Sequence, residues 1–178
     1  MGTPKALLDI GGETFLDRMI GLLHGVCETV VVVLGHDRER IQAGTQRLAQ
    51  TTVCVNPQPD RGMFSSLQCG LLAFETQDVD AVLFTPVDLP GLQPETIHRI
   101  AAERGRQAVV PVFQGHRGHP VLIARQLIEE MLKLPEGGRA TDVMRAHLAQ
   151  TCMVVVDDPG ITADVDTPEE YDLVRGGA

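Results

Sequence analysis

One segment restricts the fold more than any other, the stretch AVLFTPVDLPGL at residues 81–92. It begins with an apolar run typical of strands buried on both faces, and Pro86 and Pro90 prevent the sheet from continuing. Asp88 therefore follows the carboxyl end of a strand. In open α/β sheets ligands bind outside those ends, so Asp88 is either a ligand for a metal or polar group, or a turn residue before the next helix.

Strand and helix patterns alternate along the rest of the chain. The first residues predict a loop, and apolar residues at helical spacing then predict a helix over 13–26 with Thr14 as a possible cap. The β-branched run that follows predicts a buried strand over 29–34. Further strands are predicted at 52–55, 107–113 and 153–156, and residues 115–123 predict a turn that returns into a strand. Helices are predicted at 37–49, after Gly62, from Pro94, at 125–134, at 139–148 and after Thr167. This alternation predicts one α/β domain over residues 1–178, with three layers and a mainly parallel sheet.

Composition excludes several classes of function. The net charge is −9 and aromatic residues make up only 3% of the chain, so a basic or base-stacking surface for nucleic acid is not expected. Cys27, Cys54, Cys69 and Cys152 are widely spaced and form no C-x-x-C pair. They predict buried thiols in a reducing cytoplasm rather than disulfides or a zinc site. No signal peptide or membrane-spanning apolar run is evident, so we expect a cytoplasmic protein.

Charged residues far apart in sequence suggest a metal-assisted site. Lys5 lies in a glycine-bearing loop, and Asp164 and Asp166 precede a helix that Thr167 would begin. Together with Asp88, these carboxylates suit a Mg²⁺ ion whose other oxygen ligands come from nucleotide phosphates, which a lysine could also neutralise. The alternative is a solvated lysine and an aspartate pair that caps a helix.

Ser65 and Ser66 fall near the start of the helix after Gly62. Helix N-termini bind anions, so these serines either contact a ligand or only cap the helix. His119 lies in a turn between two predicted strands. If His119 acted as a general base on an attacking phosphate, the reaction rate would gain little, because that phosphate is already largely ionised near neutral pH. A structural role in the turn is the preferred interpretation.

Five short motifs, taken together, resemble one family. They are MGTPKALL at 1–8, GMFSSL at 62–67, PVDLP at 86–90, GHPVL at 118–122 and DVDTPE at 164–169. The chain resembles the MobA-like nucleotidyltransferases, most of all the branch that includes molybdenum cofactor cytidylyltransferase. The resemblance implies a nucleotide-diphospho-sugar transferase (Rossmann-like) fold and Mg²⁺-dependent transfer of a nucleoside monophosphate from an NTP to a terminal phosphate, with release of pyrophosphate.

The resemblance also implies roles for individual residues. Lys5 would contact the nucleotide phosphates, and Gly2 would also belong to the nucleotide-binding residues. Asp88 would bind the metal, and Asp166 with its neighbour Asp164 would form the second metal or pyrophosphate position. These roles make Lys5, Asp88 and Asp166 the expected catalytic set. Such transfer needs positioning and charge neutralisation around the α-phosphate rather than a protein nucleophile.

The expected substrates also follow from the resemblance. Ser65 and Ser66 would meet the nucleotide base, and Gly118, His119 and Pro120 would face the pterin. These features favour CTP and the molybdenum-pterin cofactor as substrates. Alternatives that remain open are a GTP-dependent enzyme on the same cofactor, a sugar-phosphate nucleotidyltransferase, and a non-catalytic accessory protein that docks on a molybdoenzyme.

The opening of the chain departs from the family pattern. The family has a strand and a glycine-rich loop before the M-G-x-x-K motif, and this sequence begins at that methionine. The resemblance therefore implies an N-terminally truncated fold, either a fragment of a longer chain or a short form without turnover. Without that strand, the strands at 30–34 and 82–84 would either pair directly or leave a gap with unsatisfied backbone groups.

Overall fold

A computed structural model describes residues 2–176, so Met1 of the opening motif and both ends of the 1–178 domain lie outside the described residues. The strands are β1 (Asp9–Ile10), β2 (Glu13–Thr14), β3 (Val31–Leu34), β4 (Thr52–Val55), β5 (Ala81–Phe84), β6 (Ala108–Phe113), β7 (His116–Arg117), β8 (Val121–Ala124) and β9 (Thr151–Val155). The helices are α1 (Phe15–His24), α2 (Arg38–Gly44), α3 (Met63–Leu72), α4 (Pro94–Ala102), α5 (Arg125–Lys133), α6 (Ala140–Ala146) and α7 (Pro168–Gly176). Short 3₁₀ turns are η1 (Lys5–Leu7), η2 (Leu48–Gln50), η3 (Pro59–Arg61), η4 (Leu148–Gln150) and η5 (Pro159–Ile161).

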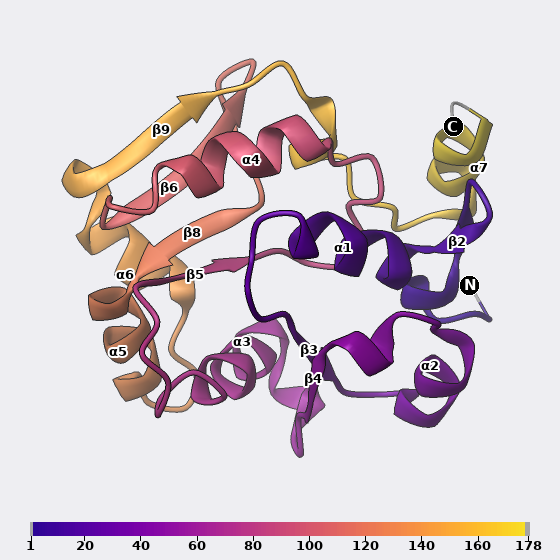
Figure 1. Ribbon diagram of the computed structural model, residues 1–178, viewed down its shortest axis with the longest axis horizontal. Helices are drawn as coiled ribbons and strands as arrows, with labels where there is room; N and C mark the ends of the chain where they lie inside the picture. Colours follow the sequence, from indigo (N-terminus) through magenta and orange to yellow (C-terminus); the bar gives the residue numbers. More distant parts are fainter. Residues whose placement is uncertain (1, 177–178) are drawn as a thin grey trace.

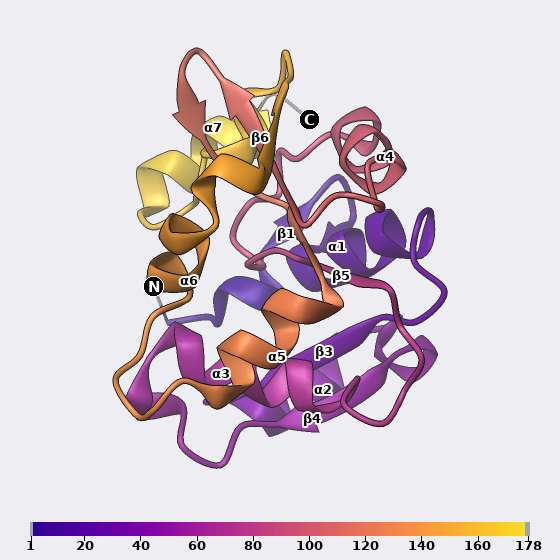
Figure 2. The same ribbon diagram turned by 90° about the vertical axis from the view of Figure 1, so that its left-hand side faces the viewer.

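The elements form three layers, as the alternating pattern predicts. Helices α1 and α4 lie on one side of the strands and α3 and α5 on the other (Figures 1 and 2). Leu71 of α3 and Leu127 of α5 are buried in one cluster with Val82 of β5. On the opposite face, Ile100 of α4 packs with Val109 of β6. The expected α/β fold is therefore confirmed, with apolar helix faces covering both sides of the strands.

The sheet is mixed, whereas the sequence predicted a mainly parallel one. β3 pairs with β4 in parallel, and so does β6 with β9. β8 lies between β5 and β6 and runs antiparallel to both. The reason is local: the chain turns back after β6 through Gln114 and Gly115, which have φ angles of 49° and 83°. A tight turn of this kind joins antiparallel strands, whereas a parallel connection needs a long crossover.

Besides the β1–β2 hairpin, the described strands form two groups, β3 with β4 and β5 to β9, that do not pair with each other. β3 bonds only to β4, and β5 bonds only to β8, so within residues 2–176 the two groups are not joined by a backbone ladder. Of the two outcomes expected for strands at 30–34 and 82–84, the structure therefore has the gap rather than direct pairing. In Figure 2, β5 and β3 run one above the other with no strand between them.

Several local features follow the sequence signals and others do not. The Thr14 side chain accepts a hydrogen bond from the Asp17 N–H at 3.0 Å and so caps α1, as expected from its type and place. The segment before it was expected to be a loop, but β1 and β2 form a hairpin there. Gly11 and Gly12 turn that hairpin with φ angles of 63° and 89°, which glycine adopts at low cost.

The lengths of the helices and the state of the cysteines bear on two expectations from the sequence. Among the described residues, every helix is too short or too polar to cross a bilayer. All four cysteines have free thiols. They are only half-buried, however, so the prediction of buried thiols is wrong. Cys27 and Cys152 pack against core clusters from the margin rather than inside them.

Candidate functional site

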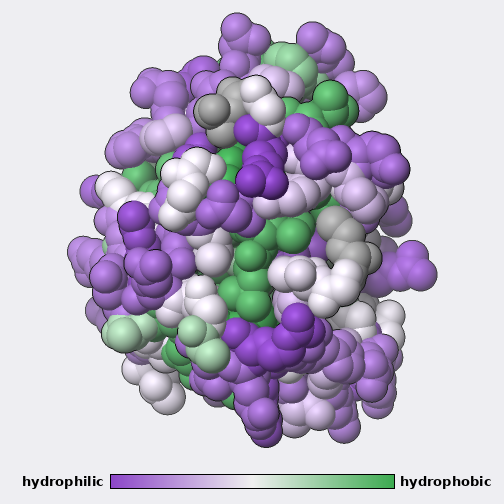
Figure 3. Space-filling model, turned by 90° about the vertical axis from the view of Figure 1, so that its right-hand side faces the viewer, coloured by the Kyte–Doolittle hydropathy of each residue, from purple (hydrophilic) through white to green (hydrophobic). Residues whose placement is uncertain are grey.

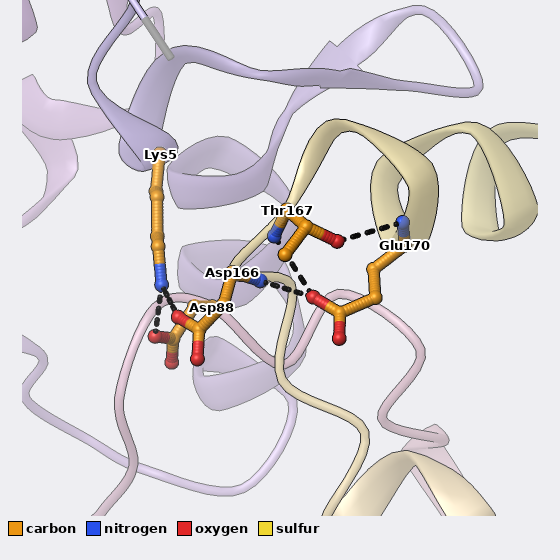
Figure 4. A network of polar contacts seen from close by, with 5 residues as sticks. All are labelled: Lys5, Asp88, Asp166, Thr167 and Glu170. Carbon is orange, nitrogen blue, oxygen red and sulfur yellow. Dashed lines mark hydrogen bonds and ion pairs between the residues drawn. The ribbon is translucent and has the colours of Figure 1, made fainter.

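Three charged side chains from distant parts of the sequence meet at one point. The Lys5 ammonium donates a hydrogen bond to Asp88 Oδ2 at 3.0 Å and a second, short one to Asp166 Oδ1 (Figure 4). These are the lysine and two of the acids that the sequence analysis singled out. The side chains of Lys5 and Asp88 are about one-third and one-quarter exposed, at 32% and 24%, so the cluster is open to solvent on one side.

The local fold explains why Lys5 and Asp88 face one another. Lys5 begins η1, and the next residue, Ala6, is buried against Val32 and Leu34 of β3. Asp88 follows β5, and the next residue, Leu89, is only 3% exposed. A buried apolar neighbour therefore holds each charged residue at the carboxyl ends of these strands, where α/β folds bind ligands.

The segment DVD at 164–166 is held in place by its central residue. Val165 is fully buried at 0% exposure, in a cluster with Leu8 and Phe15. Its N–H donates to the Asp88 carbonyl at 2.9 Å. The flanking Asp164 and Asp166 are exposed. The alternation of polar and apolar residues thus anchors the loop beside Asp88 and leaves two carboxylates at the solvent side.

A capping box immediately after Asp166 fixes its backbone. Glu170 Oε2 accepts hydrogen bonds from the N–H groups of Asp166 and Thr167, both at 2.8 Å, and the Glu170 N–H donates to Thr167 Oγ1 at 3.2 Å (Figure 4). The bond from Asp166 and then that from Thr167 lower the pKa of Glu170. The sequence analysis missed Glu170, although T-x-x-E before a helix is the signature of this motif.

Replacing Glu170 with alanine is expected to weaken the docking of α7 measurably, because two backbone N–H groups lose their acceptor. The matched control is Glu169→Ala, which removes a neighbouring first-turn charge that lacks these contacts. Tyr171 is the single tyrosine of a chain without tryptophan, and its hydroxyl donates to the Asp9 carbonyl at 2.8 Å. Its fluorescence during urea unfolding reports this docking, and equal effects of the two substitutions would contradict the assignment.

The charges in the cluster stabilise one another. The hydrogen bond from Lys5, and then its positive charge, holds the pKa of Asp166 below its ordinary value. Partial burial disfavours the charged form of Lys5, but the hydrogen bonds to Asp166 and Asp88 outweigh this, so the pKa of Lys5 is raised. The Lys5 ammonium and the Asp166 carboxylate therefore each favour the charged form of the other.

The donor set fits a divalent cation that is shared with a ligand. Among the described residues, no group of three or more histidine, cysteine, aspartate or glutamate side chains could enclose a metal alone. Asp88 and Asp166 nevertheless converge on a single cation, the Lys5 ammonium. Two carboxylates that leave most coordination positions free are what Mg²⁺ uses when phosphate oxygens complete its shell.

The two serines form a separate polar group. Asn56 Nδ2 donates to Ser65 Oγ at 2.8 Å and to Ser66 Oγ at 3.0 Å, in the first turn of α3. Asn56 is only 5% exposed and follows the last residue of β4. The serines make no hydrogen bond to the lysine–carboxylate cluster in the described part of the chain. Asn56 was not predicted from the sequence, although a polar residue directly after a predicted strand is a usable signal.

The Gly118–His119–Pro120 turn lies on the Asp88 side of the fold. The His119 N–H donates to the Ile161 carbonyl at 2.9 Å, and its ring meets the Phe84 ring edge-on, with centroids 5.9 Å apart. Burial lowers the pKa of His119, although the Phe84 backbone and the charge of Asp88 oppose this. The His119–Pro120 peptide bond is cis. A half-buried ring packed against Phe84 agrees with a structural role for His119.

Gly2 lies near the lysine in sequence, but the structure gives it a different contact. Its carbonyl accepts a hydrogen bond from Arg40 Nη2 of α2 at 3.3 Å. Gly2 therefore tethers the start of the described chain to α2 rather than joining the lysine–carboxylate cluster.

The family model described as MobA-like NTP transferase domain matches residues 1–152. The chain belongs to this family. Among curated proteins, molybdenum cofactor cytidylyltransferase of Escherichia coli K12 is 24% identical over 172 residues, which cover 96% of this chain and 86% of that protein. The bifunctional protein GlmU of Rhodococcus opacus is 29% identical over 154 residues, and the match spans only 29% of its length.

Solved structures of other proteins share the fold of this chain. Rv0371c of Mycobacterium tuberculosis H37Rv superposes with a TM-score of 0.86 and 23% identity, covering 99% of this chain and 90% of that one. A manganese complex of the same protein gives 0.83. Molybdopterin-guanine dinucleotide biosynthesis protein A of Archaeoglobus fulgidus gives 0.68 with 13% identity, covering 98% of this chain and 90% of that one. The nucleotide-diphospho-sugar transferase fold expected from the motifs is confirmed.

Proposed function

We propose that this protein transfers CMP from CTP to the molybdenum-pterin cofactor, with release of pyrophosphate, in a Mg²⁺-dependent reaction. The observation that carries the proposal is the meeting of Lys5, Asp88 and Asp166 at the carboxyl ends of the strands in a member of the MobA-like family. The cytidylyl part rests on the similarity to the E. coli cytidylyltransferase, which extends over nearly the whole chain.

The roles of the cluster follow from its charges. Asp88 and Asp166, with Asp164 beside them, would hold Mg²⁺, which would supply positive charge at the phosphates. Lys5 forms ion pairs with Asp88 and Asp166, so a cation bound to these carboxylates would release the Lys5 ammonium for the phosphate oxygens. Preorganised positive charge at the reacting phosphate is the main contribution that a protein makes to nucleotidyl transfer. The manganese complex of Rv0371c supports a divalent cation in this fold.

The remaining residues would bind the two substrates. Ser65 and Ser66, oriented by the buried Asn56, present hydroxyl groups that can hydrogen-bond a nucleotide base. Gly118, His119 and Pro120 lie near Asp88 and would form the wall facing the pterin. We propose a cytoplasmic location, which agrees with four unpaired thiols, and a molybdoenzyme as the partner that receives the product.

Calorimetry with CTP, in the presence and absence of Mg²⁺, tests this proposal. We expect CTP to bind at least about tenfold more tightly with Mg²⁺, because each carboxylate otherwise repels the triphosphate. GTP under the same conditions is the control for base preference. Equal Mg²⁺-dependent affinity for both nucleotides would remove the support for cytidine, and no Mg²⁺ dependence for either would contradict the metal site.

A guanylyltransferase is the alternative within the same pathway, since a structural neighbour from A. fulgidus is named for guanine dinucleotide synthesis. Pyrophosphate release assays separate the candidates. Release that needs CTP and the pterin supports the cytidylyltransferase, and release that needs GTP and the pterin supports the guanylyltransferase. Turnover of a sugar phosphate without pterin would support a sugar-phosphate nucleotidyltransferase. Binding of pterin or molybdoenzyme without any release would indicate an accessory protein.

A further inference from the structure

A buried carboxyl group outside the lysine–carboxylate cluster joins two segments of the candidate site. Asp158 lies after β9 and is only 1% exposed. Its Oδ2 atom accepts hydrogen bonds from the Gln93 N–H at 3.0 Å and the Thr96 hydroxyl at 2.6 Å, and its Oδ1 atom accepts one from the Gly160 N–H at 2.8 Å. Burial of a carboxyl group is costly without such bonds, so these contacts form together when this part of the chain folds.

The donors to Asp158 Oδ2 belong to the segment that follows Asp88. Gln93 immediately precedes α4, and its own side chain makes no capping hydrogen bond. Asp158 supplies an acceptor from 65 residues away and places a carboxyl group at the N-terminus of this helix, where such groups are favoured. The Asp88 loop (residues 86–93) is thus fixed at its far end by a side chain of the β9–α7 connection (residues 156–167).

The two segments also meet through their backbones, inside the molecule rather than on its largely polar outer surface (Figure 3). A Cβ added at Gly160 would lie 2.4 Å from the Gly91 carbonyl oxygen, so the backbones approach as closely as only glycine permits. Leu92 and Ile161, the residues after these glycines, are buried in one cluster at 0% and 1% exposure. The Asp158 contacts therefore close a packed junction.

A second join lies nearer the lysine–carboxylate cluster. The Val165 N–H donates to the Asp88 carbonyl at 2.9 Å, and Asp166 follows directly. The Asp88 loop and the β9–α7 connection are therefore tied at two places, by Asp158 at one end and by Val165 at the other. A change at the first join is expected to alter the relative position of the two segments, and with it the separation of Asp88 from Asp166.

We propose that Asp158 is a positioning residue for the metal site: it holds the Asp88 loop against the β9–α7 connection so that Asp88 and Asp166 can share one divalent cation. This inference rests on the proposed function and deepens it. Among the described residues, the hydrogen bonds of Asp158 do not reach Lys5, Asp88 or Asp166, so it acts on the site only through the segments that it joins. Metal ligands have to be held within about 0.5 Å of their productive geometry, so a small shift matters.

Hydrogen exchange at the Val165 amide measures the second join in the absence of metal and nucleotide. Asp158→Asn turns one accepting oxygen into an NH₂ group that faces donors, so we expect the Val165 amide to exchange at least about tenfold faster. Thr96→Val keeps the shape of the side chain but removes one donor, and it should act in the same direction by a smaller factor. This second variant carries the test if Asp158→Asn fails to fold.

Matched controls separate positioning from a general loss of stability. Asp157→Asn makes the same change at the exposed neighbouring residue, and Thr96→Ser keeps the hydroxyl group. Both should leave the exchange of the Val165 amide unchanged. The Val109 amide of β6, a strand in the core of the fold, reports global unfolding and should be unaffected in all four variants.

Binding of Mn²⁺ alone, followed by water proton relaxation, tests the effect on the metal site. Mn²⁺ prefers the same oxygen ligands as Mg²⁺ and is paramagnetic. We expect Asp158→Asn to weaken Mn²⁺ binding at least about fivefold, because one carboxylate is moved away from the other. In an Asp88→Asn background the same substitution should weaken it little further, since the ligand that Asp158 places is already lost. A general loss of stability would act equally in both backgrounds.

Three results would overturn the role of Asp158. They are unchanged exchange of the Val165 amide in both test variants, equal acceleration at Val165 and Val109, and independent losses of Mn²⁺ affinity from Asp158→Asn and Asp88→Asn. If any of these occurred while the unsubstituted chain bound Mn²⁺, the proposed function would still stand. If the unsubstituted chain bound no Mn²⁺, the proposed metal site and the role of Asp158 in it would both be wrong, even with accelerated exchange at Val165.

Discussion

Substituting Asp88 with asparagine is expected to lower the rate of nucleotidyl transfer by about 100-fold to 1000-fold, the range seen when one preorganised electrostatic group is removed. Asparagine keeps the shape of the side chain but removes the charge that the cation needs. Lys5 would retain its bond to Asp166, so the fold around η1 should persist. Pyrophosphate release and Mg²⁺-dependent CTP affinity are the measurements.

The control for this substitution is Asp78→Asn, which removes the same charge from an exposed loop after α3. It should leave both measurements unchanged, because the charge lies outside the cluster. If Asp88→Asn left Mg²⁺-dependent CTP binding intact, Asp88 would be only a turn residue, the alternative that its place in the sequence also allowed.

Replacing Gly118 with alanine is expected to reduce the free energy of unfolding by about 3 kcal/mol, since a backbone collision inside a packed region cannot be relieved by a rotamer change. A Cβ at this position would lie 2.2 Å from the Ile161 carbonyl oxygen. Ile161 is itself only 1% exposed, and its carbonyl accepts the His119 N–H. The turn that carries His119 and Pro120 would therefore have to separate from η5.

Urea unfolding of Gly118→Ala beside Gly105→Ala measures this effect. A Cβ at Gly105 would have nothing within 4 Å, so that substitution controls for the change of residue type. A difference below about 0.5 kcal/mol between the two variants, the ordinary range of surface substitutions, would show that the turn moves freely.

The sequence was most informative where one local rule acts alone. The apolar runs predicted β3 and β5, and the type and position of Thr14 predicted the cap of α1. Both predictions were possible because the burial of a short apolar run and side-chain capping depend on neighbouring residues only. Tight turns were harder. The β1–β2 hairpin was expected to be a loop, because a strand of two residues is too short to show the alternation of apolar and polar residues by which strands are detected.

The direction of β8 shows a second limit. The chain pattern at 107–123 was consistent with a turn back into a strand, but nothing in it said that β8 would lie between β5 and β6. Strand order depends on contacts between residues far apart in the chain, and an apolar run has no preference for one apolar neighbour over another. The predicted parallel sheet was therefore mixed in the structure.

For the candidate site, the sequence by itself determined the residue types: Lys5, Asp88, Asp164 and Asp166 were selected by charge, by their places after strands or before a helix, and by resemblance. Only the tertiary structure decided that Lys5 lies between Asp88 and Asp166, that Val165 anchors the loop, and that Glu170 holds the backbone of Asp166. The physical reason is distance along the chain. Contacts between residues separated by 83 and 161 positions arise from burial of the whole core, which no local pattern encodes.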